Sequence, residues 1–213
     1  YQSDKPIIIY KNDNGFDVYT DFSKKIIVDK KNIKNFLNIQ TQEKSSSIDG
    51  LNCYIGFFGY KLLCDNIGIQ LPKQKTTNFY SGIFYKPKTK ISIGKKILIQ
   101  STKTNFRNIK TNSKKYSKLN KNFNLNLTLK QYSKLFDDFS KNIRQGKTYQ
   151  IKIAQTYSKK GNINAIDLFW QLMQTNESPE SFLIRDKGYS IISCSPETLL
   201  LKKGDLIKTK PIA

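Results

Sequence analysis

Glu197 has the clearest setting for chemistry in this chain of 213 residues. It follows Ser195-Pro196 and lies between Cys194 and the apolar run 199–201. Because Pro196 cannot donate to a sheet ladder, we expect a strand to be interrupted or bulged there. A carboxyl group beside apolar neighbours has a raised pKa, as a general acid near neutral pH requires. On spacing alone, an ordinary surface glutamate at a strand end is the simpler interpretation.

Gln150 is the second polar residue in a suggestive position. Residues 148–157 alternate as a strand does, with Tyr149, Ile151 and Ile153 on one face and Gln150 on the other. An ordinary half-exposed strand glutamine would give the same pattern, and the residues alone leave both interpretations open.

The composition excludes several other kinds of catalytic site. The sequence contains no histidine, and its three cysteines, Cys53, Cys64 and Cys194, lack metal-ligand spacing. These facts argue against a zinc site, a disulfide framework and a Ser-His or Cys-His nucleophile. We expect buried, reduced cysteines in a cytoplasmic protein.

The chain is strongly basic, with 37 Lys and Arg against 16 Asp and Glu and a formal charge of +21. Clustered positive charge would favour a nucleic-acid partner. Here the basic residues are spread along the chain, and arginine, which suits bidentate phosphate contacts, is nearly absent. We therefore attribute the charge to a Lys-, Asn- and Ile-rich composition and expect no nucleic-acid partner. We also find no signal peptide and no apolar run that could span a bilayer, so we expect no membrane partner.

The elements before residue 128 are mostly strands and turns. Residues 1–100 are predicted to be an amino-terminal β-rich region. Residues 101–127, rich in Ser, Thr, Asn and Lys, are predicted to be a flexible linker or surface excursion. The candidate elements are strands at 7–10, 16–19, 26–28, 83–85 and 91–100, turns at 12–15 and 86–90, and a short helix at 33–37.

Residues 128–213 carry sharper signals. Thr128 and Gln131 fit a capping box ahead of an apolar stripe at helical spacing, and Gly146 supplies the stop of that helix. Asn164 can cap a second amphipathic helix.

Two hairpins complete the pattern, one across 187–188 and one across 203–204. Helices followed by hairpins predict an α+β fold with antiparallel β-sheets flanked by helices.

Four stretches occur in the order and at the spacing of a known family. They read Arg-Gln-Gly-Lys-Thr-Tyr-Gln-Ile-Lys-Ile-Ala-Gln at 144–155, Asn-Glu-Ser-Pro at 176–179, Ser-Pro-Glu at 195–197 and Pro-Ile-Ala at 211–213. In them the chain resembles the front half of the chorismate-utilising enzymes, which include the anthranilate, aminodeoxychorismate, isochorismate and salicylate synthases. A weaker resemblance covers residues 50–94.

The resemblance implies a chorismate-binding-enzyme type of fold, with residues 128–213 as the first part of the chorismate-binding domain. In the family, Pro-Ile-Ala is followed by Gly-Thr and by the half that carries most of the active site. The chain begins at Tyr1 without an initiator Met. We therefore expect a fragment, truncated before the second half and inactive by itself.

The resemblance also implies roles for four residues. Glu197 matches the general acid that protonates the departing C4 hydroxyl of chorismate. Gln150 stands where water-adding members carry a Lys base, which favours ammonia as the nucleophile. Ala213 would form a wall of the substrate cleft, where aminodeoxychorismate synthases often carry Lys and anthranilate synthases carry Ala. Pro179 lies in a segment that lines a tryptophan site in feedback-regulated members, although Glu-Ser follows it here instead of an aromatic pair.

Together these residues favour anthranilate synthase component I, a lyase of tryptophan biosynthesis that aminates chorismate and eliminates pyruvate. The family implies Mg²⁺, with its ligands beyond Ala213 and no metal ligand in this fragment, and a glutamine amidotransferase partner that supplies ammonia. The enzyme alternative is aminodeoxychorismate synthase component I of folate and 4-aminobenzoate biosynthesis, which Tyr149-Gln150 resembles somewhat more closely. A non-catalytic basic binding module is the second alternative.

Overall fold

The computed structural model of the protein describes residues 5–42, 50–71, 79–102 and 123–212. The chain divides into two compact units, one of residues 1–113 and 165–213 and the other of residues 114–164. The first unit contains a seven-stranded antiparallel sheet. The second contains a 16-residue helix and a short two-stranded sheet.

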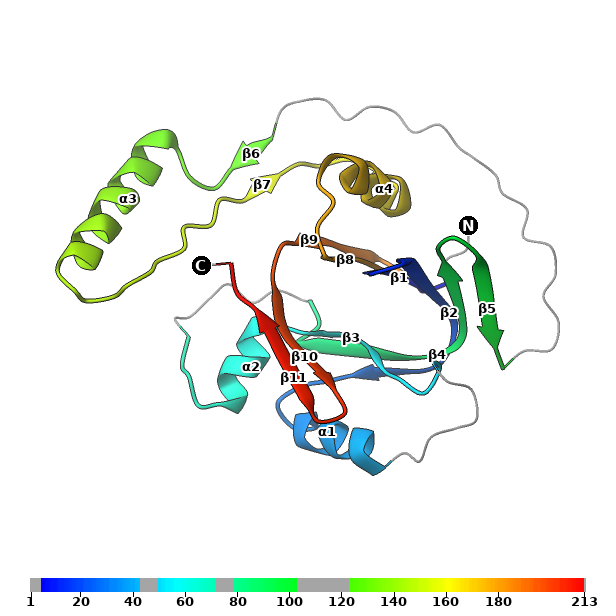
Figure 1. The fold of residues 1–213 in the computed structure, drawn as a ribbon. Helices are drawn as coiled ribbons and strands as arrows, with labels where there is room; N and C mark the ends of the chain where they lie inside the picture. The colour runs from blue at the N-terminus through cyan, green and yellow to red at the C-terminus, as the bar shows by residue number, and fades with distance from the viewer. Residues whose placement is uncertain (1–4, 43–49, 72–78, 103–122, 213) are drawn as a thin grey trace. The chain divides into compact units, whose positions relative to one another are not determined.

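Seven strands form the large sheet: β1 (Ile7–Asn12), β2 (Gly15–Ile27), β3 (Ile55–Phe58), β4 (Gly82–Ile93), β5 (Ile97–Ser101), β8 (Glu180–Asp186) and β9 (Tyr189–Ser195). Their order is β3-β4-β2-β1-β8-β9, with β5 also paired to β4 (Figure 1). Every pairing is antiparallel, which confirms the predicted sheet type. Ile8 of β1 pairs with Tyr19 of β2 on one side and with Ile184 of β8 on the other.

β2 is a single long strand, whereas the sequence predicted two separate strands within it. Asp21 has a φ of 51°, and the register against β4 shifts between Phe22 and Lys24. Such a bulge bends a strand and increases its twist without ending its pairing. The two apolar patches read from the sequence are therefore the two ends of one bent strand.

β4 is also continuous, so the turn predicted at 86–90 is wrong. Pro87 lies inside the strand, opposite the bulge of β2. On the other edge of β4, β3 pairs with 82–85 and β5 pairs with 89–93. Proline lacks a backbone N–H, and it is tolerated in this sheet where the ladders of both neighbours are interrupted.

Three clusters of buried side chains form the core of the first unit. Helix α4 (Ala165–Thr175) packs Phe169 and Met173 against Ile7, Ile9 and Leu183. Alternate side chains of a strand point to opposite faces, so Ile8 instead joins a second cluster with Ile83, Tyr85 and Ile184.

The third cluster involves two short helices, α1 (Ile33–Gln42) and α2 (Tyr60–Asn66). Phe36 of α1 and Leu62 of α2 pack with Val28 and Phe84. The sequence predicted the first of these helices but not the second. Of the three free cysteines, Cys64 is buried, whereas Cys53 and Cys194 are half-buried.

Both predicted hairpins are confirmed. β8 and β9 turn at 187–188, where Gly188 has a φ of 84°. β10 (Thr198–Lys203) and β11 (Leu206–Lys210) form a separate two-stranded sheet with its turn at 204–205. Large apolar side chains of this second hairpin are exposed, among them Leu199, whose exposed fraction is 85%.

The second unit confirms the predicted capping box. In α3 (Leu129–Arg144), the Thr128 hydroxyl accepts from the backbone N–H of Gln131, and the Gln131 side chain accepts from the backbone N–H of Thr128 at 2.8 Å. Gly146 follows the helix with a φ of 69°, as its predicted role as the stop requires.

The strand predicted over 148–157 is wrong. Only β7 (Tyr157–Ser158) is a strand, paired with β6 (Asn124–Leu125). The alternation remains visible in the burial, since Ile151 and Ile153 are half-buried between exposed neighbours. A strand also needs a hydrogen-bonded partner, and among the described residues no strand pairs with 148–156.

The compact units do not follow the predicted division into 1–100, 101–127 and 128–213. β1 comes from the first of those regions and β8 from the third, yet they are neighbours in one sheet. Most of the predicted linker lies outside the described residues, and its end contains β6.

The contact between β3 and β4 generates a prediction about stability. A Cβ atom on Gly56 would lie 1.9 Å from the carbonyl oxygen of Ile83 and 2.7 Å from Cα of Phe84. Both are backbone atoms, so Gly56→Ala must separate the strands, and we expect it to lower the free energy of unfolding by about 3 kcal/mol. Urea unfolding measures this loss.

Gly188→Ala is the matched control. Gly188 has a positive φ but no atom within 4 Å of the added Cβ, so only backbone strain of about 1 kcal/mol is expected. Equal losses in the two variants would contradict the steric explanation.

Candidate functional site

Glu197 lies in the two-residue connection between β9 and β10, and its side chain is half-buried. β9 ends at Ser195 and β10 begins at Thr198, so the predicted interruption at Pro196 is confirmed. The carboxyl group therefore comes from a short connection fixed by a strand on each side. This setting suits a proton donor, and the role of general acid stays a prediction.

Gln150 belongs to the second unit, in the irregular segment between α3 and β7. It is exposed, and its backbone carbonyl accepts a hydrogen bond from the Thr148 hydroxyl at 3.1 Å. The neighbouring Tyr149 has an exposed fraction of 91%. Gln150 therefore lies in irregular backbone and not in a strand. The role of its side-chain amide in selecting ammonia stays a prediction.

Pro179 lies in the same unit as Glu197, and the sheet brings their segments together. Glu180, directly after Pro179, pairs with Ser195, two residues before Glu197. Pro179 itself is exposed, while Ser178 is buried and accepts at its carbonyl from the Ser181 hydroxyl at 2.7 Å. Ala213 lies outside the described residues, so its place in a substrate cleft stays a prediction.

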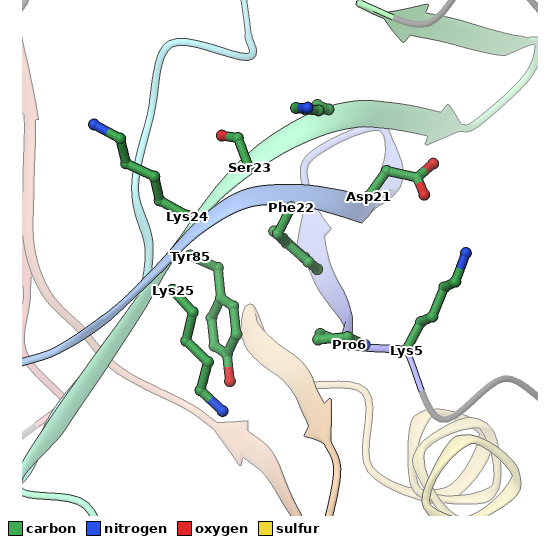
Figure 2. A pocket seen from close by; sticks show the side chains of 9 residues that line it. Lys5, Pro6, Asp21, Phe22, Ser23, Lys24, Lys25 and Tyr85 are labelled. Atoms are coloured by element: carbon green, nitrogen blue, oxygen red, sulfur yellow. The ribbon is translucent and has the colours of Figure 1, made fainter.

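A cavity of about 500 Å³ opens where β2 bends, and it is lined by none of Glu197, Gln150 and Pro179. Figure 2 shows Phe22 between Tyr85 and Asp21, with Lys25 beside the Tyr85 ring. The further cationic side chains of the lining are Lys5, Lys24 and Lys88. The ammonium groups of these lysines and of Lys25 would attract an anionic group to the cavity electrostatically.

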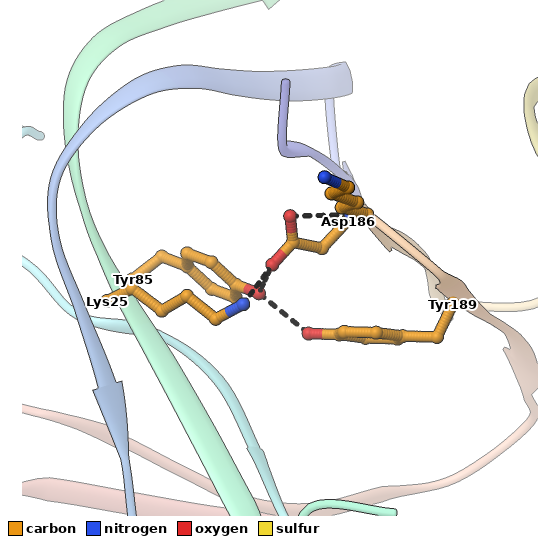
Figure 3. A network of polar contacts seen from close by, with 5 residues as sticks. Lys25, Tyr85, Asp186 and Tyr189 are labelled. Atoms are coloured by element: carbon orange, nitrogen blue, oxygen red, sulfur yellow. Dashed lines mark hydrogen bonds and ion pairs between the residues drawn. The ribbon is translucent and has the colours of Figure 1, made fainter. Parts of the chain in front are cut away.

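A polar cluster ties four strands together beside this cavity (Figure 3). Asp186 accepts from Lys25 Nζ at 2.5 Å and from the Tyr85 hydroxyl at 2.6 Å, and the Tyr85 and Tyr189 hydroxyls lie 2.6 Å apart. Burial by itself would raise the pKa of Asp186. The hydrogen bonds from Lys25, Tyr85 and the backbone of Lys187 outweigh burial and lower that pKa below its usual value of 3.8.

No local sequence pattern marks this cluster, because its members are separated by 60 residues or more along the chain, apart from the hairpin pair Asp186 and Tyr189. Only the sheet order places Lys25 of β2 and Tyr85 of β4 beside the end of β8. The pKa of Tyr85 is strongly raised by burial and then by its bonds to Asp186 and Tyr189, so its hydroxyl stays protonated.

The implied Mg²⁺ finds no ligand set in the part of the chain that the structure describes. No three Asp, Glu or Cys side chains there are grouped so that they could hold a metal ion. Nor is any helix of the described residues both long and apolar enough to cross a membrane.

Comparison with known proteins gives a match along nearly the whole chain. A profile of the family described as chorismate binding enzyme matches residues 5–213. The ordered motifs of residues 144–213 are therefore part of a similarity that also includes the amino-terminal strands.

Individual relatives are similar over shorter segments. Anthranilate synthase component 1 of Haloferax volcanii is 35% identical over 71 residues, 33% of this chain and 14% of that protein. Anthranilate synthase component 1 1 of Haloarcula marismortui is 35% identical over 86 residues, 40% of this chain and 16% of that protein. Aminodeoxychorismate synthase component 1 of Escherichia coli is 32% identical over 87 residues, 41% of this chain and 19% of that protein. The chain thus covers less than a fifth of the length of each relative.

The polar cluster around Asp186 predicts a pH-dependent stability. Because the pKa of Asp186 is lowered by folding, its carboxylate stabilises the protein above pH 3.8, and this contribution is lost as the pH falls through the folded-state pKa. We expect Asp186→Asn to lower the free energy of unfolding by about 2 kcal/mol at pH 7. The deficit should shrink progressively below pH 4, as measured by urea unfolding at a series of pH values.

The control is Asp205→Asn, the same substitution in the exposed turn between β10 and β11. It should change stability by less than about 0.5 kcal/mol. A deficit of Asp186→Asn that is the same at pH 7 and pH 3 would contradict the role of the charge.

Proposed function

The chain belongs to the chorismate binding enzyme family, and we propose that the protein acts as anthranilate synthase component I, converting chorismate and ammonia to anthranilate and pyruvate. The observation that carries the proposal is the placement of Glu197 in the short connection between β9 and β10. Two of the relatives described above bear the name of this enzyme.

In the proposed reaction, ammonia forms a bond to C2 of chorismate while the C4 hydroxyl departs. The carboxyl group of Glu197 donates the proton with which that hydroxyl leaves as water. Ammonia is already a nucleophile, so the amide of Gln150 has only to orient it, whereas a Lys at this position would serve as a base toward water. Loss of pyruvate then gives anthranilate.

Ala213 supports the choice of product, because it stands where aminodeoxychorismate synthases often carry a Lys that acts on the ring. The amidotransferase partner and Mg²⁺ are part of the same proposal.

Aminodeoxychorismate synthase component I is the second candidate. It is supported by the Escherichia coli relative of that name, whose match covers 41% of this chain. Both candidates aminate chorismate with loss of the C4 hydroxyl, but the first places the amino group at C2 and eliminates pyruvate, whereas the second places it at C4 and keeps the pyruvyl group.

Product analysis separates the candidates. The full-length protein, given chorismate, an ammonium salt and Mg²⁺, should form a fluorescent product with the mass of anthranilate, together with an equal amount of pyruvate. A product that carries its amino group at C4 and retains the pyruvyl group would support the second candidate. Consumption of no chorismate, by a protein shown to be folded by circular dichroism, would contradict both.

Removal of the proton donor tests the role of Glu197. Glu197→Gln keeps the size of the side chain and removes its acid, so kcat should fall by about 10²-fold or more while the KM for chorismate changes little. Steady-state kinetics measure both constants.

Glu177→Gln is the matched control, because Glu177 is an exposed glutamate of the same unit whose only described ion pair is with Lys11 at 3.4 Å. Its kcat should stay within about twofold of the parent value. A Glu197→Gln variant with undiminished kcat would show that another group supplies the proton.

A further inference from the structure

Glu180 of β8 bonds through its side chain to β1 and β10 and is paired in the sheet with β9. It is the first residue of β8, and its two carboxylate oxygens accept from different donors. One oxygen accepts from the Tyr10 hydroxyl of β1 at 2.7 Å, and the other accepts from the Thr198 hydroxyl at 2.5 Å. Hydrogen bonds to a charged acceptor at these distances are strong ones.

The second of these bonds reaches the residue next to Glu197. Ser195 is opposite Glu180 in the ladder of β8 and β9, and Thr198 bonds to the side chain of the same Glu180. Both ends of the connection 195–198 are therefore attached to one residue. Between them lie only Pro196, whose φ is fixed by its ring, and Glu197.

We propose that Glu180 is a positioning residue for the general acid, holding Thr198 so that the carboxyl group of Glu197 keeps one place relative to the substrate. This inference rests on the role proposed above for Glu197. Proton transfer requires a donor within hydrogen-bond reach, and a displacement of about 1 Å can cost up to about 10²-fold in rate. A two-residue connection released at one end would permit such a displacement.

Tyr10 bonds to the carboxylate oxygen of Glu180 that Thr198 does not use. Its pKa is raised to about 12 by burial and then by the hydrogen bond to Glu180, so its hydroxyl remains a donor throughout the neutral range. Glu180 is thus held from β1 while it holds β10.

Substitution of Thr198 tests the proposal in the full-length protein with the chorismate assay. Thr198→Val removes the hydroxyl and keeps the shape of the side chain, and kcat should fall about tenfold with the KM for chorismate nearly unchanged. Thr198→Ser restores the donor and should recover kcat to within about twofold. Glu180→Gln, which keeps an acceptor but loses the charge, should give an intermediate kcat.

Ser92→Ala provides a control for general destabilisation. The Ser92 hydroxyl donates to Asp17 at 2.6 Å in the same sheet, so its loss removes a similar bond between β2 and β4, away from the Ser-Pro-Glu connection. Its kcat should match that of the parent protein, even if its unfolding midpoint falls as far as that of Thr198→Val.

The outcomes separate the two proposals. If Glu197→Gln loses activity but Thr198→Val and Glu180→Gln keep the parent kcat, the positioning role is wrong and the general acid stands. If Ser92→Ala and Thr198→Val lose kcat in proportion to lost stability, the bond is merely structural and the positioning role is again wrong. If Glu197→Gln itself keeps full activity, the proposed function of Glu197 fails first.

Discussion

The pairing of β1 with β8 is the interaction on which the rest of the first unit depends. It joins residues 7–10 to residues 182–185 and so attaches β9 to the strands of the amino-terminal half. The cluster of Phe169 and Met173 with Ile7 and Ile9 needs this pairing, because its members come from both segments. The Lys25–Asp186 ion pair and the Tyr10–Glu180 hydrogen bond also bridge the two segments.

The same pairing explains why polar groups can be buried in this sheet at modest cost. A buried carboxylate is costly unless charged or hydrogen-bonding partners surround it. The side chain of Asp186 has an exposed fraction of 6%, and its partners arrive from β2, β4 and the β8–β9 turn. None of these elements could supply all the partners alone, so the burial of Asp186 is a consequence of the strand order.

Local signals predicted local structure well. The capping box of Thr128 and Gln131, the stop at Gly146 and the hairpin turn at Gly188 each depend on a few neighbouring residues, and each was readable from the sequence. The turn predicted at 86–90 was wrong because β4 continues through this range, where β3 pairs with the residues before it and β5 with the residues that end it. The strand expected around Gln150 failed for the related reason that alternation indicates a strand only where a partner exists.

The candidate site also contains residues with a local sequence signal and residues without one. Glu197 was found because Pro196 marks an interruption and because the motif resembles a known one. Glu180 carried no local signal, since its importance comes from a ladder partner in β9 and from donors in β1 and β10. The proposed general acid was therefore easier to find from the sequence than the residue proposed to position it.

The sheet order also has a consequence for the time course of synthesis. Ile8 is made long before its partner Ile184, and at roughly 5–20 residues per second the delay is on the order of 10 to 35 s. During this interval one edge of β1, rich in isoleucine, has no partner from its own chain, and such an edge is a template for pairing with other chains. A net charge of +21 opposes that association, because like-charged nascent chains repel one another. The basic composition thus opposes association at the edge of a strand whose partner is made much later.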